Sequence, residues 1–127
     1  MTRNTTPLES EEQRALFQWA ALAAAKWPEL RSMYHVPNEG LRSGRAGARL
    51  KLEGMRAGVP DVCLPVPRGG YGALYIELKR TKGGSLSENQ RTWIESLKML
   101  GNKAVVCYGW EQARDEIERY LKGCHDE

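Results

Sequence analysis

The stretch DVCLPVPRGGYGALYIELK, residues 61–79, decides how this chain folds. Its two ends, 61–66 and 73–79, are rich in branched and aromatic residues, which favour β-strands. The segment between them, 67–72, supplies the proline and glycines that tight connections need. The sequence therefore predicts an antiparallel β-hairpin.

The register of this hairpin brings polar side chains together. If the turn centres on Gly69, Asp61 lies opposite Glu77, and Lys79 stands on the same face because side chains two apart in a strand point the same way. Facing carboxylates repel each other unless a cation compensates them. A divalent metal supplies that charge and the lysine stabilises charge on a phosphate oxygen, so the pattern indicates a phosphodiesterase site. The alternative is an exposed Glu77–Lys79 edge pair, with Asp61 as a turn residue after Pro60.

The flanking sequence alternates between helical and strand patterns. We expect helices from a capping box at Thr6–Glu9 to Pro28, over 45–55, from a Ser87 cap to Gly101, and over 111–121. Further strands are expected over 33–36 and 104–108. This order predicts an α/β fold in which helices flank a small mixed central sheet, with a helical crossover after the hairpin.

Length and composition fit one soluble domain. The chain has 127 residues, 41% of them hydrophobic, and a formal charge of +3, so we expect a single domain over 1–127, with a core at about 8–122 and short disordered termini. Three dispersed cysteines match neither a disulfide framework nor a zinc motif. The longest apolar run, 19–25, is too short for a membrane span, and no signal peptide is recognisable, so we expect a cytoplasmic protein.

Basic residues are concentrated just before the hairpin. Segment 31–58 holds six basic and two acidic residues, a net charge of +4. Such a block suits a polyanion such as DNA, although a solvated helix face has the same composition. The candidate DNA-backbone contacts are Arg42, Arg45, Arg49, Lys51 and Arg56, with Arg80 and Lys82 beyond the hairpin.

Three motifs in this order resemble a known family. They are Gly58-Val59-Pro60-Asp61, Ile76-Glu77-Leu78-Lys79 and Leu86-Ser87-Glu88-Asn89-Gln90. Together they are similar to the stand-alone, phage-type VRR-NUC nucleases of the PD-(D/E)XK superfamily, and the resemblance extends from about Glu9 to Leu121. It implies a restriction-endonuclease-like core in a bacterial or phage-infected cell.

The resemblance also implies roles for particular residues. Its metal shell is Asp61, Glu77 and the main-chain carbonyl of Leu78, and an opening-helix Glu, here Glu9, reaches the ion through water. Lys79 becomes the catalytic lysine. The site glutamine corresponds to Gln90, which would hold a water or a phosphate oxygen.

Several of these roles have alternatives. Glu9 is also placed to cap its own helix, and the neighbouring Glu11 or Glu12 could be the matching carboxylate. Gln90 is likewise the fourth residue of a capping box. The segment at His35 resembles one near the site of phage-type members, although a histidine on a short strand is commonly structural.

The function implied is a Mg²⁺- or Mn²⁺-dependent DNA endonuclease that leaves 5′-phosphate and 3′-hydroxyl ends. Similarity to compact junction resolvases suggests a homodimer acting on branched or junction-like DNA. One alternative is a catalytically inactive DNA-binding or assembly module on the same fold. A phosphoesterase acting on small nucleotides is disfavoured, because the sequence has no Gly-rich phosphate loop.

Overall fold

The computed structural model of the chain describes residues 5–37 and 44–123. Two residues that the sequence analysis considered, Arg42 and the cysteine Cys124, lie outside these described residues. None of the helices within them combines the length and the apolar character that crossing a membrane requires.

A four-stranded mixed sheet forms the centre of the fold. Its strands lie in sequence order: β1 (Tyr34–His35), β2 (Val62–Leu64), β3 (Leu74–Lys79) and β4 (Lys103–Tyr108). β2 runs antiparallel to both β1 and β3, and β4 runs parallel to β3. The predicted α/β fold with a small mixed sheet is therefore confirmed.

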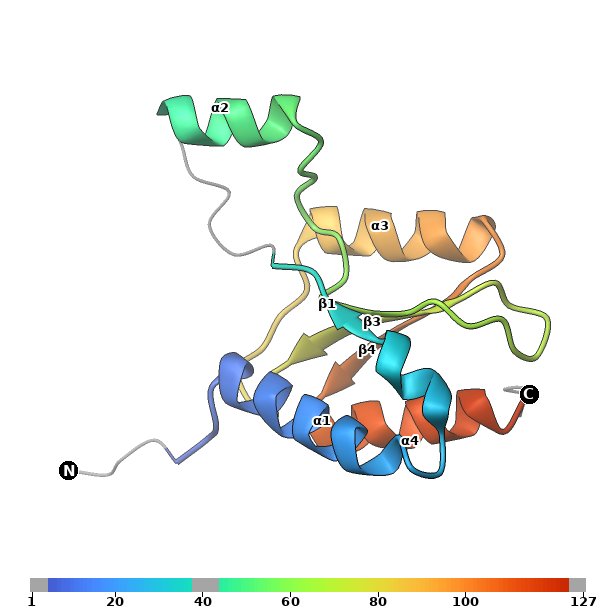
Figure 1. Cartoon of the computed structure of the whole chain (residues 1–127). Helices are drawn as coiled ribbons and strands as arrows, with labels where there is room; N and C mark the ends of the chain where they lie inside the picture. Colours follow the sequence, from blue (N-terminus) through green and yellow to red (C-terminus); the bar gives the residue numbers. More distant parts are fainter. Residues whose placement is uncertain (1–4, 38–43, 124–127) are drawn as a thin grey trace.

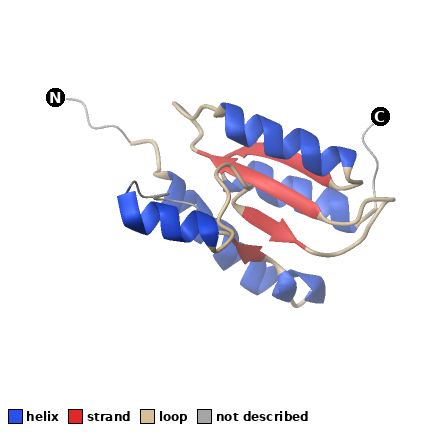
Figure 2. Ribbon diagram, turned by 90° about the horizontal axis from the view of Figure 1, so that it is seen from above, coloured by secondary structure: helices blue, strands red, loops and turns tan. Residues whose placement is uncertain are grey.

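Helices cover both faces of this sheet. Helices α1 (Glu9–Ala23) and α4 (Trp110–Leu121) pack on one face, and α3 (Glu88–Met99) packs on the other (Figure 1). A short 3-10 helix, η1 (Pro28–Ser32), follows α1. Helix α2 (Gly44–Leu52) stands apart from these layers, beside the sheet rather than over it in the view from above (Figure 2).

The hairpin has the predicted register. Val62 pairs with Ile76, Cys63 with Tyr75 and Leu64 with Leu74. Continued by one residue, this register sets Asp61 opposite Glu77. The tip itself closes between Arg68 and Tyr71, so the turn is offset by one residue from the ladder, although the pairing of the two strands is the one predicted.

Alternate residues of β3 serve two different layers. Leu74, Ile76 and Leu78 are buried in the main core, which α1 and α4 complete with residues such as Leu16 and Ile117. Tyr75 instead packs with the smaller cluster under α3, formed by Ile94, Leu97 and Ala104. Because side chains alternate along a strand, Glu77 and Lys79 share the α3 side of the sheet with Tyr75. Helix α3 is thus the element positioned to contact the two polar residues of β3.

Helix α3 begins at the expected cap. The Ser87 hydroxyl accepts from the Gln90 backbone N–H at 3.1 Å, and Gln90 Oε1 accepts from the Ser87 backbone N–H at 2.9 Å. Gly101, with φ +93°, follows the helix and turns the chain toward β4. The helix therefore forms the predicted crossover between two parallel strands.

The start of α1 differs from the sequence prediction. The helix begins at Glu9, and Leu8 rather than Thr6 is its N-cap residue. The Leu8 backbone N–H donates to Glu11 Oε1 at 2.7 Å, so Glu11 is the residue that caps this helix. The capping box expected at Thr6–Glu9 was therefore wrong by two residues. A glutamate three residues after the N-cap residue accepts from its backbone N–H, and this spacing fits Leu8 and Glu11 as well as it fits Thr6 and Glu9.

Helix α2 is shorter than the predicted 45–55 segment. It ends at Leu52, and the chain turns at Gly54, where φ is +106°. Only glycine adopts this backbone conformation readily, so Gly54 ends the helix before Met55. The η1 turn was not predicted, because the sequence there shows only the proline that stops a preceding helix.

Candidate active site

Three carboxylates from three elements meet at one end of the sheet. Oxygen atoms of Glu9, Asp61 and Glu77 all lie within 4.8 Å of one another. Glu9 comes from the first turn of α1, Asp61 directly precedes β2, and Glu77 lies in β3. The predicted facing pair is thus joined by a third carboxylate, from the helix packed against the sheet. We call this group the acidic cluster.

Asp61 is held in place on both sides by neighbouring strands. Its side-chain Oδ2 accepts from the Leu78 backbone N–H at 2.9 Å. Its main-chain oxygen accepts from the Val36 N–H at 2.7 Å and from His35 Nδ1 at 3.1 Å. These bonds fix both the backbone and the carboxylate before any ligand arrives.

Glu77 is the most enclosed member of the cluster, with 1% of its surface exposed. Its Oε2 accepts from Gln90 Nε2 at 3.0 Å and lies 3.4 Å from Lys79 Nζ. Its Oε1 is buried and has no hydrogen-bond partner among the described residues. Burial and the Asp61 carboxylate raise the pKa of Glu77 to about 8, and Lys79 lowers it in part.

Lys79 and Gln90 complete the site on the α3 side. Lys79 is buried, and its Nζ donates to Gln90 Oε1 at 3.1 Å. Gln90 therefore contacts Glu77, Lys79 and the Ser87 backbone at once. The sequence left open whether Gln90 is a cap or a site residue, and its position gives it both sets of contacts.

The acidic cluster opens into a pocket of about 290 Å³. The pocket lies where the carboxyl end of β3 meets the N-terminal ends of α1 and α3, on the left of Figure 1. Its lining combines the cluster with polar side chains: Glu9, Ser10, Gln13, His35, Asp61, Glu77 and Gln90. The cluster is therefore reachable from solvent although Glu77 is buried.

The three glutamates of the first turns of α1 have distinct environments. Glu11 caps α1 itself, as described above. Glu12 is buried and accepts from the Trp110 N–H at 3.0 Å, at the start of α4. Of the candidates that the sequence left open, Glu9 is the one that lies in the acidic cluster.

The candidate DNA contacts have different surroundings. Arg45, Arg49 and Lys51 are exposed on α2, and Arg56 and Lys82 are exposed on loops. Arg80 instead donates through Nε to the Pro7 carbonyl and through one terminal nitrogen to the Thr6 carbonyl, each at 3.1 Å. Its guanidinium therefore ties the segment before α1 to the end of β3.

Sequence reasoning missed one residue of the pocket lining. Ser10 directly follows Glu9 in α1 and also lines the pocket, although nothing in the sequence marked it as a site residue. The spacing of Ser10 and Gln13 could have predicted this position, because residues three apart in a helix share one face and Gln13 lines the pocket too. His35 lines the same pocket.

With this geometry in view, the chain can be compared with known proteins. The family model of the VRR-NUC domain matches residues 8–111. A solved structure, described as a VRR_NUC domain protein, is 27% identical with a TM-score of 0.80, and the match covers 99% of this chain and 96% of that one. A search of curated proteins finds no match.

The chain belongs to the VRR-NUC domain family. The family match spans the acidic cluster, Lys79 and Gln90, and the structural match covers nearly the whole chain. The fold is thus of the restriction-endonuclease-like type, a nuclease-type fold with a group of three carboxylates that could hold a metal ion.

Proposed function

We propose that this protein is a divalent-metal-dependent DNA endonuclease, with the whole chain acting as one nuclease domain. The observation that carries the proposal is the acidic cluster, three carboxylates within 4.8 Å, with a lysine ammonium 3.4 Å from one of them. Clustered carboxylates repel each other and destabilise the fold unless a cation is bound. Because this cluster opens into a solvent-accessible pocket, a metal ion can reach it and supply that charge.

The donor set of the cluster fits Mg²⁺ or Mn²⁺. Both ions take oxygen ligands, and the buried, unpartnered Oε1 of Glu77 is an acceptor that lacks a donor among the described residues. Glu77 and Asp61 would hold the ion directly, together with the Leu78 carbonyl, and Glu9 would reach it through water. When bound, the ion lowers the pKa of a water and polarises the phosphodiester.

The remaining site residues would act on the substrate. Lysine carries three N–H donors, and the contacts of Lys79 to Gln90 and Glu77 use two of them. The third is available to a phosphate oxygen, whose developing negative charge the ammonium would stabilise. Gln90 would hold the side chains of Lys79 and Glu77 in position relative to each other, because its amide contacts both.

Basic residues of α2 would contact the DNA backbone. Arg45, Arg49 and Lys51 are exposed on this helix, which stands apart from the sheet and the helices that cover it (Figure 1). Phosphate contacts of this kind position a duplex without reading its sequence, which suits an enzyme selective for DNA structure. Arg56 and Lys82, which are also exposed, would add further phosphate contacts, and Arg42 is kept as a candidate on its charge alone.

We further propose that the protein acts as a homodimer on branched or junction-like DNA in the cytoplasm. A two-fold dimer would present two cleavage sites to a symmetric branch point. Its products would carry 5′-phosphate and 3′-hydroxyl ends. Cys63 and Cys107 are free and buried, in keeping with a reducing compartment.

Cleavage of a panel of plasmid, linear, flapped and four-way-junction DNA tests the proposal. We expect cutting with Mg²⁺ or Mn²⁺ and none with EDTA. Asp61→Asn should abolish cutting, while Leu22→Ala, on an exposed position of α1, should cut normally. DNA binding without cutting of any substrate, unchanged in Asp61→Asn, would instead identify the inactive binding module.

A further inference from the structure

A second hollow adjoins the pocket of the acidic cluster. It has a volume of about 310 Å³ and runs between α1 and β1. The two hollows share Ser10, Gln13 and His35 in their linings, so they form one continuous groove. The second hollow adds Arg14 and Phe17, and we call it the α1 groove.

The chemistry of the α1 groove differs from that of the acidic cluster. No carboxylate lines it among the described residues; its lining offers a cation at Arg14, an aromatic ring at Phe17, and the polar groups of Ser10 and Gln13. His35 adds a further polar group. Its Nδ1 donates to the Asp61 carbonyl, which leaves Nε2 as the ring nitrogen that can contact a ligand.

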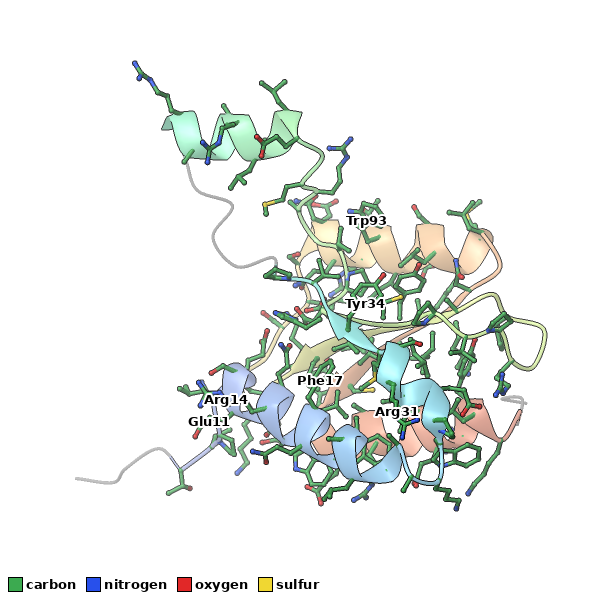
Figure 3. The ribbon with its side chains drawn as sticks, viewed as in Figure 1. Glu11, Arg14, Phe17, Arg31, Tyr34 and Trp93 are labelled. Carbon is green, nitrogen blue, oxygen red and sulfur yellow. The ribbon has the colours of Figure 1, made fainter. Side chains whose placement is uncertain are left out.

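Phe17 lies between two neighbouring hollows on this side of α1. It is half-buried against the core and lines both the α1 groove and a further hollow that extends to Arg31. Figure 3 shows Phe17 between α1 and β1, with Arg14 nearer the start of the helix. Phe17 lies eight residues after Glu9, about 12 Å along the helix axis. The ring is thus close to the acidic cluster but outside it.

We infer that the α1 groove binds an unpaired nucleotide next to the phosphodiester held at the acidic cluster. The inference rests on the proposed nuclease function and names the feature of the substrate that the site would recognise. The base would stack on Phe17, Arg14 would contact its phosphate, and His35 Nε2 would contact a polar group on the edge of the base.

Three observations favour a nucleotide over other occupants. The groove is continuous with the pocket in which the scissile phosphate would lie. It pairs an aromatic ring with a cation, the combination that binds stacked bases and their phosphates. Its volume falls at the lower end of the range for small-ligand sites, which suits one base rather than a helix of a partner protein.

Photocrosslinking tests this placement without relying on cleavage. The full-length Asp61→Asn protein is bound to branched DNA that carries 5-iodouracil unpaired near the branch point, or paired with adenine at the same position. We expect crosslinks at Phe17 from the unpaired base and few from the paired base. Phe17→Leu, which keeps an apolar side chain, should reduce the crosslink at least fivefold, and Leu22→Ala should leave it unchanged.

Cleavage assays give the second measurement. Phe17→Leu should lower kcat/KM by about tenfold or more on DNA with an unpaired nucleotide near the cut, and less than twofold on fully paired substrate. Crosslinks elsewhere, no crosslinks, or equal losses on both substrates would overturn the inference. So would a change of oligomeric state in Phe17→Leu, which would assign the groove to a second copy of the chain.

These outcomes separate the inference from the proposed function. Crosslinks at Phe17 in a protein that cuts no DNA would retain the nucleotide site and reject the nuclease. Metal-dependent cutting that Phe17→Leu does not alter would retain the nuclease and reject the nucleotide site.

Discussion

Glu12 and Trp110 are joined by a hydrogen bond that spans almost the length of the chain, from the buried carboxylate in α1 to the backbone N–H that opens α4. The Trp110 N–H is one of the first-turn donors that have no partner within α4, and Gly109, the N-cap residue, has no side chain that could cap the helix, so Glu12 supplies an acceptor from α1. The carboxylate also lies at the positive end of the α4 dipole. Because Glu9 is one turn from Glu12, this contact helps to set the end of α1 that carries Glu9.

The first prediction concerns this hydrogen bond. Glu12→Ala should lower the free energy of unfolding by about 1–3 kcal/mol, because it leaves a buried backbone donor unpaired at the start of α4. Urea unfolding measures the change. Glu11→Ala is the matched control, since Glu11 caps α1 at an exposed position, and its loss should be about 1 kcal/mol or less. Equal decreases in the free energy of unfolding of the two variants would show that the Glu12–Trp110 hydrogen bond stabilises the fold no more than an exposed helix cap does.

The second prediction concerns the pH dependence of stability without metal. The pKa of Glu77 is raised to about 8 in the folded protein from an ordinary value of 4.5, so the folded state holds more protons than the unfolded state between these pH values. The contribution of Glu77 is therefore fully present below pH 4.5 and is lost as pH rises toward 8. In EDTA, the free energy of unfolding of Glu77→Gln, relative to that of the wild type, should therefore rise by roughly 2–4 kcal/mol as the pH increases from 5 to 8. Urea unfolding at several pH values measures this difference, and parallel curves would contradict it.

The third prediction concerns metal binding. Mg²⁺ or Mn²⁺ at millimolar concentration should raise the Tm of the wild-type protein by a few degrees, because a ligand that binds only the folded state stabilises it. Asp61→Asn keeps an acceptor for the Leu78 N–H but loses the charge, so its Tm should hardly respond to either ion. Glu11→Ala, away from the pocket lining, should respond as the wild type does. Calorimetric titration would verify the binding directly, and an unchanged response in Asp61→Asn would place the metal elsewhere.

The fourth prediction separates Lys79 from the metal ligands. Lys79→Met should reduce cleavage by at least about a hundredfold, because it removes the ammonium that would stabilise charge on the phosphate. Loss of Lys79 also raises the pKa of Glu77 further, so metal binding should weaken at pH 7 and recover at pH 9. Cleavage that stays normal in a folded variant would show that Lys79 has no catalytic role. The measurement pairs a cleavage assay with metal titration at both pH values.

Much of this arrangement follows from local sequence. The proline and glycines of 67–72 mark the connection between the two strands, and the predicted register that sets Asp61 opposite Glu77 is the one found, although the tip closes between Arg68 and Tyr71, one residue out of step with the ladder. The Ser87–Gln90 pair also marked the start of α3, and the crossover geometry then places Gln90 over the β3 strand. Short-range rules of turns and caps therefore account for the α3 side of the site.

The α1 side could not be derived in the same way. Glu9, Glu11 and Glu12 lie within one helical turn, and what separates them is the packing of α1 against the sheet and against α4. The partner of Glu12 is 98 residues away, which no local pattern reveals. The place of Phe17 in the lining of the α1 groove could not be predicted for a related reason, because a half-buried aromatic residue beside an apolar stripe has the same sequence signal as a core residue.

The last prediction tests the double role of Gln90. Its side chain accepts from the Ser87 N–H as part of the helix cap, and it also contacts Lys79 and Glu77. Ser87→Ala removes the hydroxyl that accepts from the Gln90 N–H and should cost about 1 kcal/mol of stability while leaving cleavage within about twofold of wild type. Gln90→Ala should cost a similar amount of stability, but it should also lower cleavage by about tenfold or more, because Lys79 and Glu77 lose the amide that aligns them. Unfolding and cleavage measured on the same two variants distinguish the roles, and equal cleavage by both would reduce Gln90 to a helix cap.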